Sequence, residues 1–255
     1  MFAFEGPSLL SAALEAGWFI ERVFVAPDGH HHPDVSEAVE RARAVGIDIS
    51  SLETGVLEKV ADAATPQPCA AIARTRETPL EEIMLDGVVL VLDEVRDPGN
   101  LGAVIRVAEA TSCVGVYLVG ECTDPFGPKA LRASAGSAFR LPIVQGESSH
   151  STLNALSAAG FTSFATSSHV GLDFAEVSWP IRSAIIFGNE AAGLSPSMID
   201  ACDTSVRIPL AETVESLNLS VAAGILAMSA ARGLRAPDRG ESRSTMTSMS
   251  PRENP

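Results

Sequence analysis

Cysteine is scarce in this chain, and the few that occur form no spaced pair. The 4 cysteines among 255 residues include no Cys-x-x-Cys motif, which predicts free thiols rather than a disulfide framework. Long hydrophobic runs are also missing, because no apolar stretch approaches the roughly 18 residues of a membrane span. The opening residues have no basic segment followed by an apolar one, as a secretion signal would. These absences predict a cytoplasmic protein without a membrane partner.

The sequence also contains few positively charged residues. The chain has 18 Lys and Arg residues against 32 Asp and Glu residues, for a formal net charge of -14. A balance of this sign argues against nonspecific attraction to nucleic acid or to an anionic membrane. Any polyanionic ligand would therefore need a locally basic surface.

Several common catalytic motifs are absent. The sequence has no GxGxxG motif, and the segment from Gly188 to Gly193 lacks the Lys-Ser/Thr that completes a Walker loop. It also has no GxSxG elbow, no HExxH motif and no spaced Cys/His cluster. The tract His30-His31-His32 lies between loop-forming residues and has no partner cluster, so no metal site is predicted. A site in this protein is expected to act by binding and positioning.

The chain divides into three segments. Prolines at 66, 68 and 79 interrupt regular structure and a new pattern begins after Met84, which places a domain boundary near residue 80. Residues 1–80 alternate short helical and strand patterns, with helices expected at 8–17 and 35–45 and a strand at 23–26. Residues 81–235 form a second domain. The final segment, 236–255, has no apolar periodicity and is predicted to be a disordered tail.

The second domain has the pattern of an α/β fold with a parallel sheet. The apolar run from Val88 to Leu92 is typical of a strand that is covered on both faces. From Leu101 to Ala108 the apolar residues fall on one helical stripe, and Asn100 is placed to cap that helix. Further strands are expected at 114–119, 183–187 and 205–208.

Three loops at the carboxyl ends of these strands hold most of the polar and glycine residues. Open parallel sheets bind ligands at this edge, which makes these loops the candidate site. The loops contain the sequences LDEVRDPGNLGAVIR (92–106), FGNEAAGL (187–194), and IPL (208–210) followed by VESLNLSVA (214–222).

In this order, the three blocks resemble the SpoU (TrmH) family of SPOUT RNA methyltransferases, which transfer a methyl group from S-adenosylmethionine to a ribose 2′-hydroxyl. The resemblance covers residues 88–232 and includes KALRASAG at 129–136. It implies a parallel-sheet catalytic domain with a C-terminal trefoil knot, an exception to the rule that chains do not thread loops. It also implies an RNA substrate, either rRNA or tRNA, and a homodimer. Residues 1–80, with FEGP before a helix, resemble a small ribosomal-protein-L30-like substrate-binding domain.

The resemblance also implies roles for individual residues. The expected catalytic residues are Asn100, Arg106, Glu190, Ser216 and Asn218. Those expected to surround the adenosine of a bent S-adenosylmethionine are Thr166, Ser167, Gly188, Ile208, Leu210 and Leu217. Glycine suits position 188 because a backbone that passes against a ligand has no room for a Cβ. Glu190 is interpreted as orienting Asn100 or Arg106.

Arg106 matches an arginine proposed in the family to act as a base. A guanidinium has a pKa above about 12 and rarely gives up its proton. We therefore favour Arg106 as a clamp on an RNA phosphate that also stabilises developing alkoxide, acting across a dimer contact. Lys129 and Arg132 are further candidates for phosphate contacts. If RNA is the substrate, the arginines should gather on one face, away from the carboxylates, and those concerned are Arg96, Arg106, Arg132, Arg140 and Arg207.

Simpler interpretations exist for the same residues. Asn100, Ser216 and Asn218 all precede apolar helical runs, where they would serve as helix caps. The side chains of Arg106, Lys129 and Arg132 could be solvated surface charges. An alternative function is a catalytically silent RNA-binding assembly or regulatory factor on the same fold. A third is an oxidoreductase with an unusual dinucleotide site, against which the missing glycine motif argues.

Overall fold

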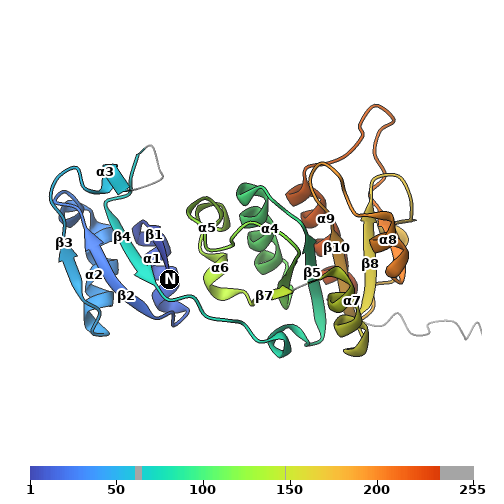
Figure 1. Ribbon diagram of the computed structural model, residues 1–255, viewed down its shortest axis with the longest axis horizontal. Coiled ribbons are helices and arrows are strands. Elements are labelled where there is room, and N and C mark those ends of the chain that lie inside the picture. Colours follow the sequence, from blue (N-terminus) through green and yellow to red (C-terminus); the bar gives the residue numbers. More distant parts are fainter. Residues whose placement is uncertain (61–64, 147, 236–255) are drawn as a thin grey trace, which may run out of the picture.

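The computed structural model describes residues 1–60, 65–146 and 148–235, which form two sheets with their own helices (Figure 1). The first sheet has four strands in the order β1-β4-β2-β3, and the second has seven in the order β7-β6-β5-β10-β8-β11-β9. This confirms the predicted fold class, a small α/β domain before a parallel-sheet domain. The predicted tail, 236–255, lies outside the described residues.

The first domain packs two longer helices against a mixed sheet, in which β4 runs antiparallel to β1 and β2 while β2 and β3 are parallel. Proline begins both α1 and α2, where its missing N–H and fixed φ suit the first helical turn. The predicted strand and both predicted helices are present. The elements are β1 (Phe2–Glu5), α1 (Pro7–Glu15), β2 (Ile20–Val25), η1 (Gly29–His31), α2 (Pro33–Ala44), β3 (Ile49–Ser51), α3 (Leu57–Val60) and β4 (Cys69–Ala73).

In the second domain every strand pair is parallel. The elements are η2 (Leu80–Ile83), β5 (Gly87–Asp93), α4 (Pro98–Ala110), β6 (Gly115–Val119), α5 (Pro128–Ser134), α6 (Ser137–Arg140), β7 (Ile143–Gly146), α7 (Ser149–Ala158), β8 (Thr162–Ser167), β9 (Leu172–Asp173), η3 (Phe174–Glu176), β10 (Arg182–Phe187), α8 (Pro196–Ala201), β11 (Thr204–Arg207) and α9 (Leu219–Arg235). None of the helices in the described residues is long and apolar enough to cross a membrane.

Strand β5 lies inside this sheet, between β6 and β10, and is buried on both faces, as its apolar sequence predicts. Val88 and Leu90 belong to the core that includes residues of α4, α5 and α9. Val89 and Val91 belong to the opposite core, which includes residues of α7 and α8. Strand β11 lies near one edge of the sheet. After it the chain crosses back toward the centre of the sheet, where α9 packs against α4, β5 and β10. The predicted trefoil knot stays a prediction.

Helix α4 begins earlier than the sequence pattern indicated. Asp97 is its N-cap residue, with a side-chain oxygen that accepts a hydrogen bond from the backbone N–H of Asn100 at 2.8 Å. The prediction that Asn100 caps this helix is therefore wrong. Asp97 followed by Pro98 supplies both a capping acceptor and a preset φ one turn earlier. The side chain of Asn100 is left available for other contacts.

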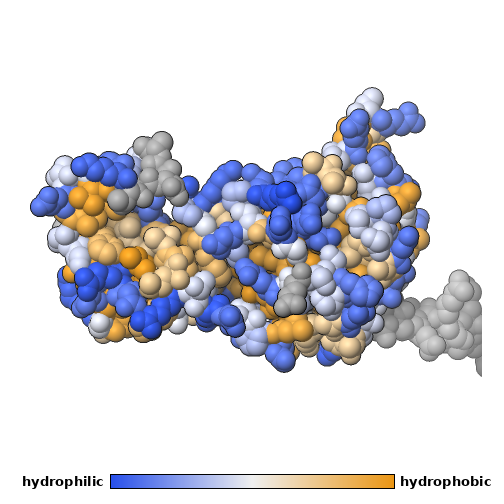
Figure 2. Space-filling model, viewed as in Figure 1, coloured by the Kyte–Doolittle hydropathy of each residue, from blue (hydrophilic) through white to orange (hydrophobic). Residues whose placement is uncertain are grey.

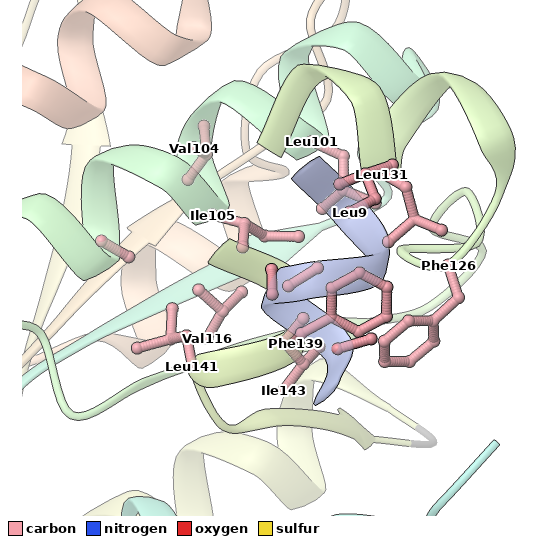
Figure 3. Close-up of a cluster of buried hydrophobic side chains, with 14 of the residues drawn as sticks. Leu9, Leu101, Val104, Ile105, Val116, Phe126, Leu131, Phe139, Leu141 and Ile143 are labelled. Atoms are coloured by element: carbon pink, nitrogen blue, oxygen red, sulfur yellow. The ribbon is translucent and has the colours of Figure 1, made fainter. Parts of the chain in front are cut away.

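The two domains also contact each other directly. Residues 74–79, which link them, form no helix or strand. The buried core nevertheless continues across the junction, since Leu9 of α1 belongs to the same cluster as Leu101, Leu131 and Phe139 (Figure 3). In the space-filling view the two domains form one continuous body (Figure 2). The substrate-domain candidate is therefore docked on the second domain as well as tethered to it.

Candidate functional site

A cavity of about 660 Å³ lies at the carboxyl ends of β8, β10 and β11. Most of the predicted site residues line it, including every residue expected to surround a cofactor and all but one of the expected catalytic residues. These are Asn100, Thr166, Ser167, Gly188, Glu190, Ile208, Leu210, Ser216, Leu217 and Asn218. The three sequence blocks, which are far apart along the chain, therefore meet in one place.

The strand order explains this meeting. Strand β10 lies between β5 and β8, although it follows both in the sequence. Parallel strands end at the same edge of a sheet, so the loops that follow β5, β8, β10 and β11 are neighbours there. The loop after β5 leads into α4 and brings Asn100 to the cavity. The loop after β11 leads into α9 and brings Ser216 and Asn218.

A hydrogen-bonded network fixes the Asn100 amide at the cavity. Its Nδ2 donates to Oε1 of Glu190 at 3.3 Å, and its Oδ1 accepts from Nδ2 of Asn218 at 2.9 Å. Both ends of the amide are therefore oriented by residues from the other two loops. The expected contact between Glu190 and Asn100 is present. Within the part of the chain that the structure describes, Glu190 accepts hydrogen bonds from Arg96, Asp97 and Asn100 but not from the alternative partner, Arg106.

Glu190 remains a carboxylate in this network. Burial alone would raise its pKa, but hydrogen bonds from its own backbone N–H, from the backbone of Asp97 and Arg96 and from the Asn100 side chain hold the pKa below its usual range. Glu215 also lines the cavity. Two carboxylates at the wall of one cavity favour a ligand that carries positive charge.

Asn218 has a structural role as well. Its Oδ1 accepts hydrogen bonds from the backbone N–H of Ser220 at 2.9 Å and from the Ser220 hydroxyl at 2.7 Å. These contacts satisfy a free N–H at the start of α9. Helix capping and a place in the site are therefore combined in this residue. Ser216 lies exposed at the cavity wall.

The cavity offers both an apolar and a polar wall. Its apolar side chains include Ile208, Leu210 and Leu217, which suit a flat aromatic group such as a purine. On the polar side, the Thr166 hydroxyl donates to the carbonyl of Ile186 at 2.8 Å. The Ser167 oxygen accepts from two backbone N–H groups of the following loop. The lining therefore fits a ligand with an apolar ring and a polar, cationic remainder.

The structure gives a different reason for glycine at 188 from the one predicted. A Cβ at this position would lie 2.3 Å from the carbonyl carbon of Gly193 and 2.4 Å from the backbone nitrogen of Leu194. Asn189 and Gly193 pair in an isolated bridge that closes this loop. The other end of the loop thus excludes a Cβ at this position. Gly188 also lines the cavity, and its close approach to a ligand stays a prediction.

Asn189 is a site residue that sequence reasoning did not select. Its Nδ2 donates to the carbonyl of Glu94 at 2.9 Å, while its Oδ1 accepts from the backbone of Ala191 and Ala192. Glu94 has a positive φ of 55°, a conformation that side-chain-bearing residues adopt at a cost. An asparagine in a strand-end turn is a visible local signal. Its contact with Glu94, 95 positions away in the sequence, leaves no such local signal.

The predicted RNA-binding residues lie outside the cavity. Arg106 is exposed on α4 and takes part in no ion pair within the described ranges, and the same holds for Arg132 on α5. The Lys129 ammonium pairs with Asp97 at 3.1 Å. Helices α4 and α5 pack closely, because a Cβ on Gly102 would lie 2.3 Å from the Ala130 carbonyl oxygen.

The prediction that carboxylates lie away from the five arginines is wrong for two of them, and the gathering of all five on one face stays a prediction. Arg96 pairs with Glu121 at 3.3 Å, and Arg140 donates to Glu109 at 2.9 Å. Nearby carboxylates therefore neutralise two of the five. Local pairing of this kind is how a chain with an excess of acidic residues uses much of its positive charge.

Comparisons with known proteins agree with this architecture. A family model described as "SpoU rRNA Methylase family" matches residues 87–228, and one described as "MRM3-like substrate binding domain" matches residues 1–71. The 23S rRNA (guanosine(2553)-2'-O)-methyltransferase RlmP of Bacillus subtilis is 32% identical over 225 residues, which cover 88% of this chain and 86% of that protein.

Some solved structures match over a similar extent, and others over less. The AdoMet-bound rRNA methyltransferase from Sinorhizobium meliloti has a TM-score of 0.81 at 33% identity, covering 91% of this chain and 87% of that one. The SpoU methyltransferase AviRb from Streptomyces viridochromogenes, in complex with AdoMet, has a TM-score of 0.82 at 26% identity, with coverage of 91% and 89%. The A. aeolicus TrmH/SpoU tRNA modifying enzyme covers only 60% of this chain and 80% of its own, with a TM-score of 0.52 at 26% identity.

Proposed function

This chain belongs to the SpoU rRNA methylase family, and we propose that it transfers the methyl group of S-adenosylmethionine to a ribose 2′-hydroxyl of 23S rRNA. It is an S-adenosylmethionine-dependent RNA methyltransferase. The extent of the match supports rRNA over tRNA. The relative named for 23S rRNA matches across 88% of the chain, whereas the tRNA-modifying structure covers 60%.

The cavity residues fit S-adenosylmethionine. We assign the apolar wall of Ile208, Leu210 and Leu217 to the adenine ring and the Ser167 side to the polar part of the ligand. When bound, the cofactor supplies a methyl group on a positively charged sulfur. The carboxylates of Glu190 and Glu215 favour that charge at the cavity.

The network around Asn100 would position the ribose. Methyl transfer to oxygen is an in-line displacement, so the attacking hydroxyl must be held on the axis opposite the sulfur. An amide whose two ends are fixed by Glu190 and Asn218 has a single orientation in which to contact that hydroxyl. We assign Asn100 to this contact, with Glu190 and Asn218 as the residues that position it.

We assign Arg106 to an RNA phosphate, where its charge stabilises negative charge that develops on the ribose oxygen. It does not line the cavity of its own subunit. This location agrees with the expectation that Arg106 serves the cavity of a partner subunit. Arg132 on the adjacent α5 is a second free cation for the same RNA strand.

We propose that a second copy of this chain covers one face of α9. The side chains of Val221, Ile225, Met228 and Arg232 recur on that face and line a groove of about 570 Å³ with Phe174. Val221 and Met228 are 49% and 43% exposed. A contiguous apolar strip of this kind on a helix suits a two-fold contact in which the same helix packs against its symmetry mate.

Met228→Glu is expected to convert the dimer into a monomer, because it would place a charge in the proposed contact. The measurement is molar mass by light scattering during size-exclusion chromatography. Val45→Glu, at a residue 69% exposed on the first domain, is the matched control and should leave the mass unchanged. A Met228→Glu protein that remains dimeric, or a parent protein that is fully active as a monomer, would contradict the proposal.

Ribose-methylation mapping on total RNA tests the proposed function. Cells that lack the gene should lose one 2′-O-methyl mark in 23S rRNA, and the parent gene should restore it. A lost mark in tRNA would contradict the assignment to rRNA. Cofactor binding by calorimetry without the loss of any mark would instead favour the catalytically silent RNA-binding factor.

A further inference from the structure

Five aromatic rings join the first domain to the second. Phe2 of β1 stacks on Phe126 with ring centroids 5.0 Å apart, and Phe4 meets Phe139 edge-on at 5.1 Å. Trp18 contacts both rings of the second domain, at 5.0 Å from Phe126 and 5.5 Å from Phe139. We call these five residues the aromatic junction. Edge-on and offset-stacked rings have directional preferences, so the junction favours one relative orientation of the domains.

A buried hydrogen bond and a close approach of the backbone further restrict the relative orientation of the two domains. The Trp18 indole N–H donates to the Phe139 carbonyl at 2.8 Å, with Trp18 7% exposed and Phe139 fully buried. At Gly136, just before α6, a Cβ would lie 2.8 Å from the Cβ of Ala12 on α1. Groups packed at this density interlock and resist sliding.

The covalent link alone would not fix the domains. Residues 74–79 form no helix or strand, and most of them are exposed. A tether of six residues without secondary structure allows a wide range of orientations when nothing else holds the domains. The packed contact that contains the aromatic junction, and not the linker, therefore restricts their relative position.

The junction is connected to the catalytic network through α5. Phe126 lies two residues before the start of α5, and Lys129 in the first turn of α5 pairs with Asp97, the N-cap residue of α4. The same two helices meet closely at Gly102, two residues beyond Asn100. The first domain is thus packed against the helix pair that carries Asn100, as Figure 3 shows for Leu9, Leu101 and Leu131.

We propose that the aromatic junction positions the RNA. By holding the first domain in one orientation, it places the RNA element bound there at a fixed offset from Asn100 and the cavity, and this offset selects the ribose that is methylated. The inference rests on the proposed function. Phe2 and Trp18 act in it as positioning residues, since neither lines the cavity.

Phe2→Ala is the sharpest test. Phe2 is only partly buried and takes no part in the Trp18–Phe139 hydrogen bond, so we expect the Phe2→Ala protein to keep that bond and the fold. Phe19→Ala is the matched control, because Phe19 is a 58% exposed phenylalanine of the same domain whose ring lies against Arg74 rather than in the junction. The readouts are kcat and KM for RNA, the cofactor Kd by calorimetry, the unfolding midpoint and the mapped methylation sites.

We expect Phe2→Ala to lower kcat by about tenfold to 100-fold, the scale of effect that misplacement of a reacting group by about an ångström produces. KM for RNA and the cofactor Kd should change by less than about threefold, because each binding site is intact. Methylation should spread to neighbouring riboses. Phe2→Tyr should restore kcat and the single site, and Phe19→Ala should match the parent.

Three results would overturn the proposal. They are a rise in KM with kcat unchanged, a loss of cofactor binding together with a lower unfolding midpoint, and equal behaviour of the Phe2→Ala and Phe19→Ala proteins. Small-angle X-ray scattering separates this proposal from the proposed function. If the parent methylates no RNA, the function fails. A Phe2→Ala protein as compact as the parent removes the junction's role in fixing the domains.

Discussion

An Arg106→Ala enzyme is expected to bind S-adenosylmethionine as tightly as the parent and to methylate RNA about 100-fold to 1,000-fold more slowly. The cofactor affinity should hold because Arg106 lies outside the cavity of its own subunit and, at the partner's cavity, is assigned to an RNA phosphate rather than to the cofactor. The rate should fall because a fixed cation near a developing oxyanion contributes on this scale. Single-turnover methyl transfer from labelled cofactor measures the rate, and calorimetry measures the affinity.

Arg106→Lys is the matched control for this prediction. It keeps the charge but removes the planar, bidentate donor, so we expect an intermediate rate if a phosphate is clamped by the guanidinium. If Arg106 were an ordinary solvated arginine, both variants would behave like the parent. A raised cofactor Kd in Arg106→Ala would also contradict the assignment, since it would place this side chain at the cofactor.

Much of the catalytic sheet follows from local sequence pattern. The run Val88 to Leu92 is apolar without alternation because both of its faces are covered, and that is visible without a structure. The start of α4 differs from the prediction because Asp97 and Asn100, three positions apart, are both residue types that can cap a helix. Asp97 prevails since Pro98 follows it, so that a cap and a preset φ coincide.

The site itself is a product of strand order, which local pattern does not encode. In the sequence, Asn100 lies 90 positions from Glu190 and 118 positions from Asn218, its two partners in the network. They meet because β10 is inserted beside β5. Resemblance to a family brought these residues together in advance. Physical inference from the sequence alone reached only the edge of the sheet where they lie.

The aromatic junction was hidden for a related reason. The five residues of the junction show no common spacing in the sequence, and each alone has the apolar character of a residue that packs in or against the core of its own domain. The net charge of the chain was a poor guide to its substrate. The excess of carboxylates argued against RNA, yet local ion pairs such as Arg140 with Glu109 engage only some of the arginines, and Arg106 and Arg132 take part in none within the described ranges.

Replacing Asn100 with aspartate is expected to abolish most activity at neutral pH, by about 100-fold or more, and to let part of it return as the pH falls. The new carboxylate would face Glu190, whose Oε1 now accepts a hydrogen bond from Asn100 Nδ2 at 3.3 Å. Two carboxylates at this distance cannot both stay ionised without strong repulsion. The network that we propose to orient the attacking hydroxyl would therefore be broken at neutral pH.

The direction of the pH dependence follows from the state of Glu190 in the parent. Its pKa is held below the usual range partly by the Asn100 hydrogen bond, against the effect of burial, so the parent network is intact at neutral pH. In the Asn100→Asp protein that bond is lost and a like charge is added, so the pair takes up a proton at a raised apparent pKa. Below that pKa the shared proton bridges the two carboxyl groups and restores a contact in place of the amide.

Asn100→Ala separates this effect from a simple loss of the side chain. It should be inactive to a similar degree at neutral pH, but with no recovery toward low pH, since no second carboxyl is present to share a proton. The measurement is the single-turnover rate from pH 5 to 8 for both variants and the parent, with cofactor binding followed in parallel. Equal pH profiles for the aspartate and alanine variants would show that Asn100 and Glu190 do not act as a coupled pair, and full activity in either would remove Asn100 from the reaction.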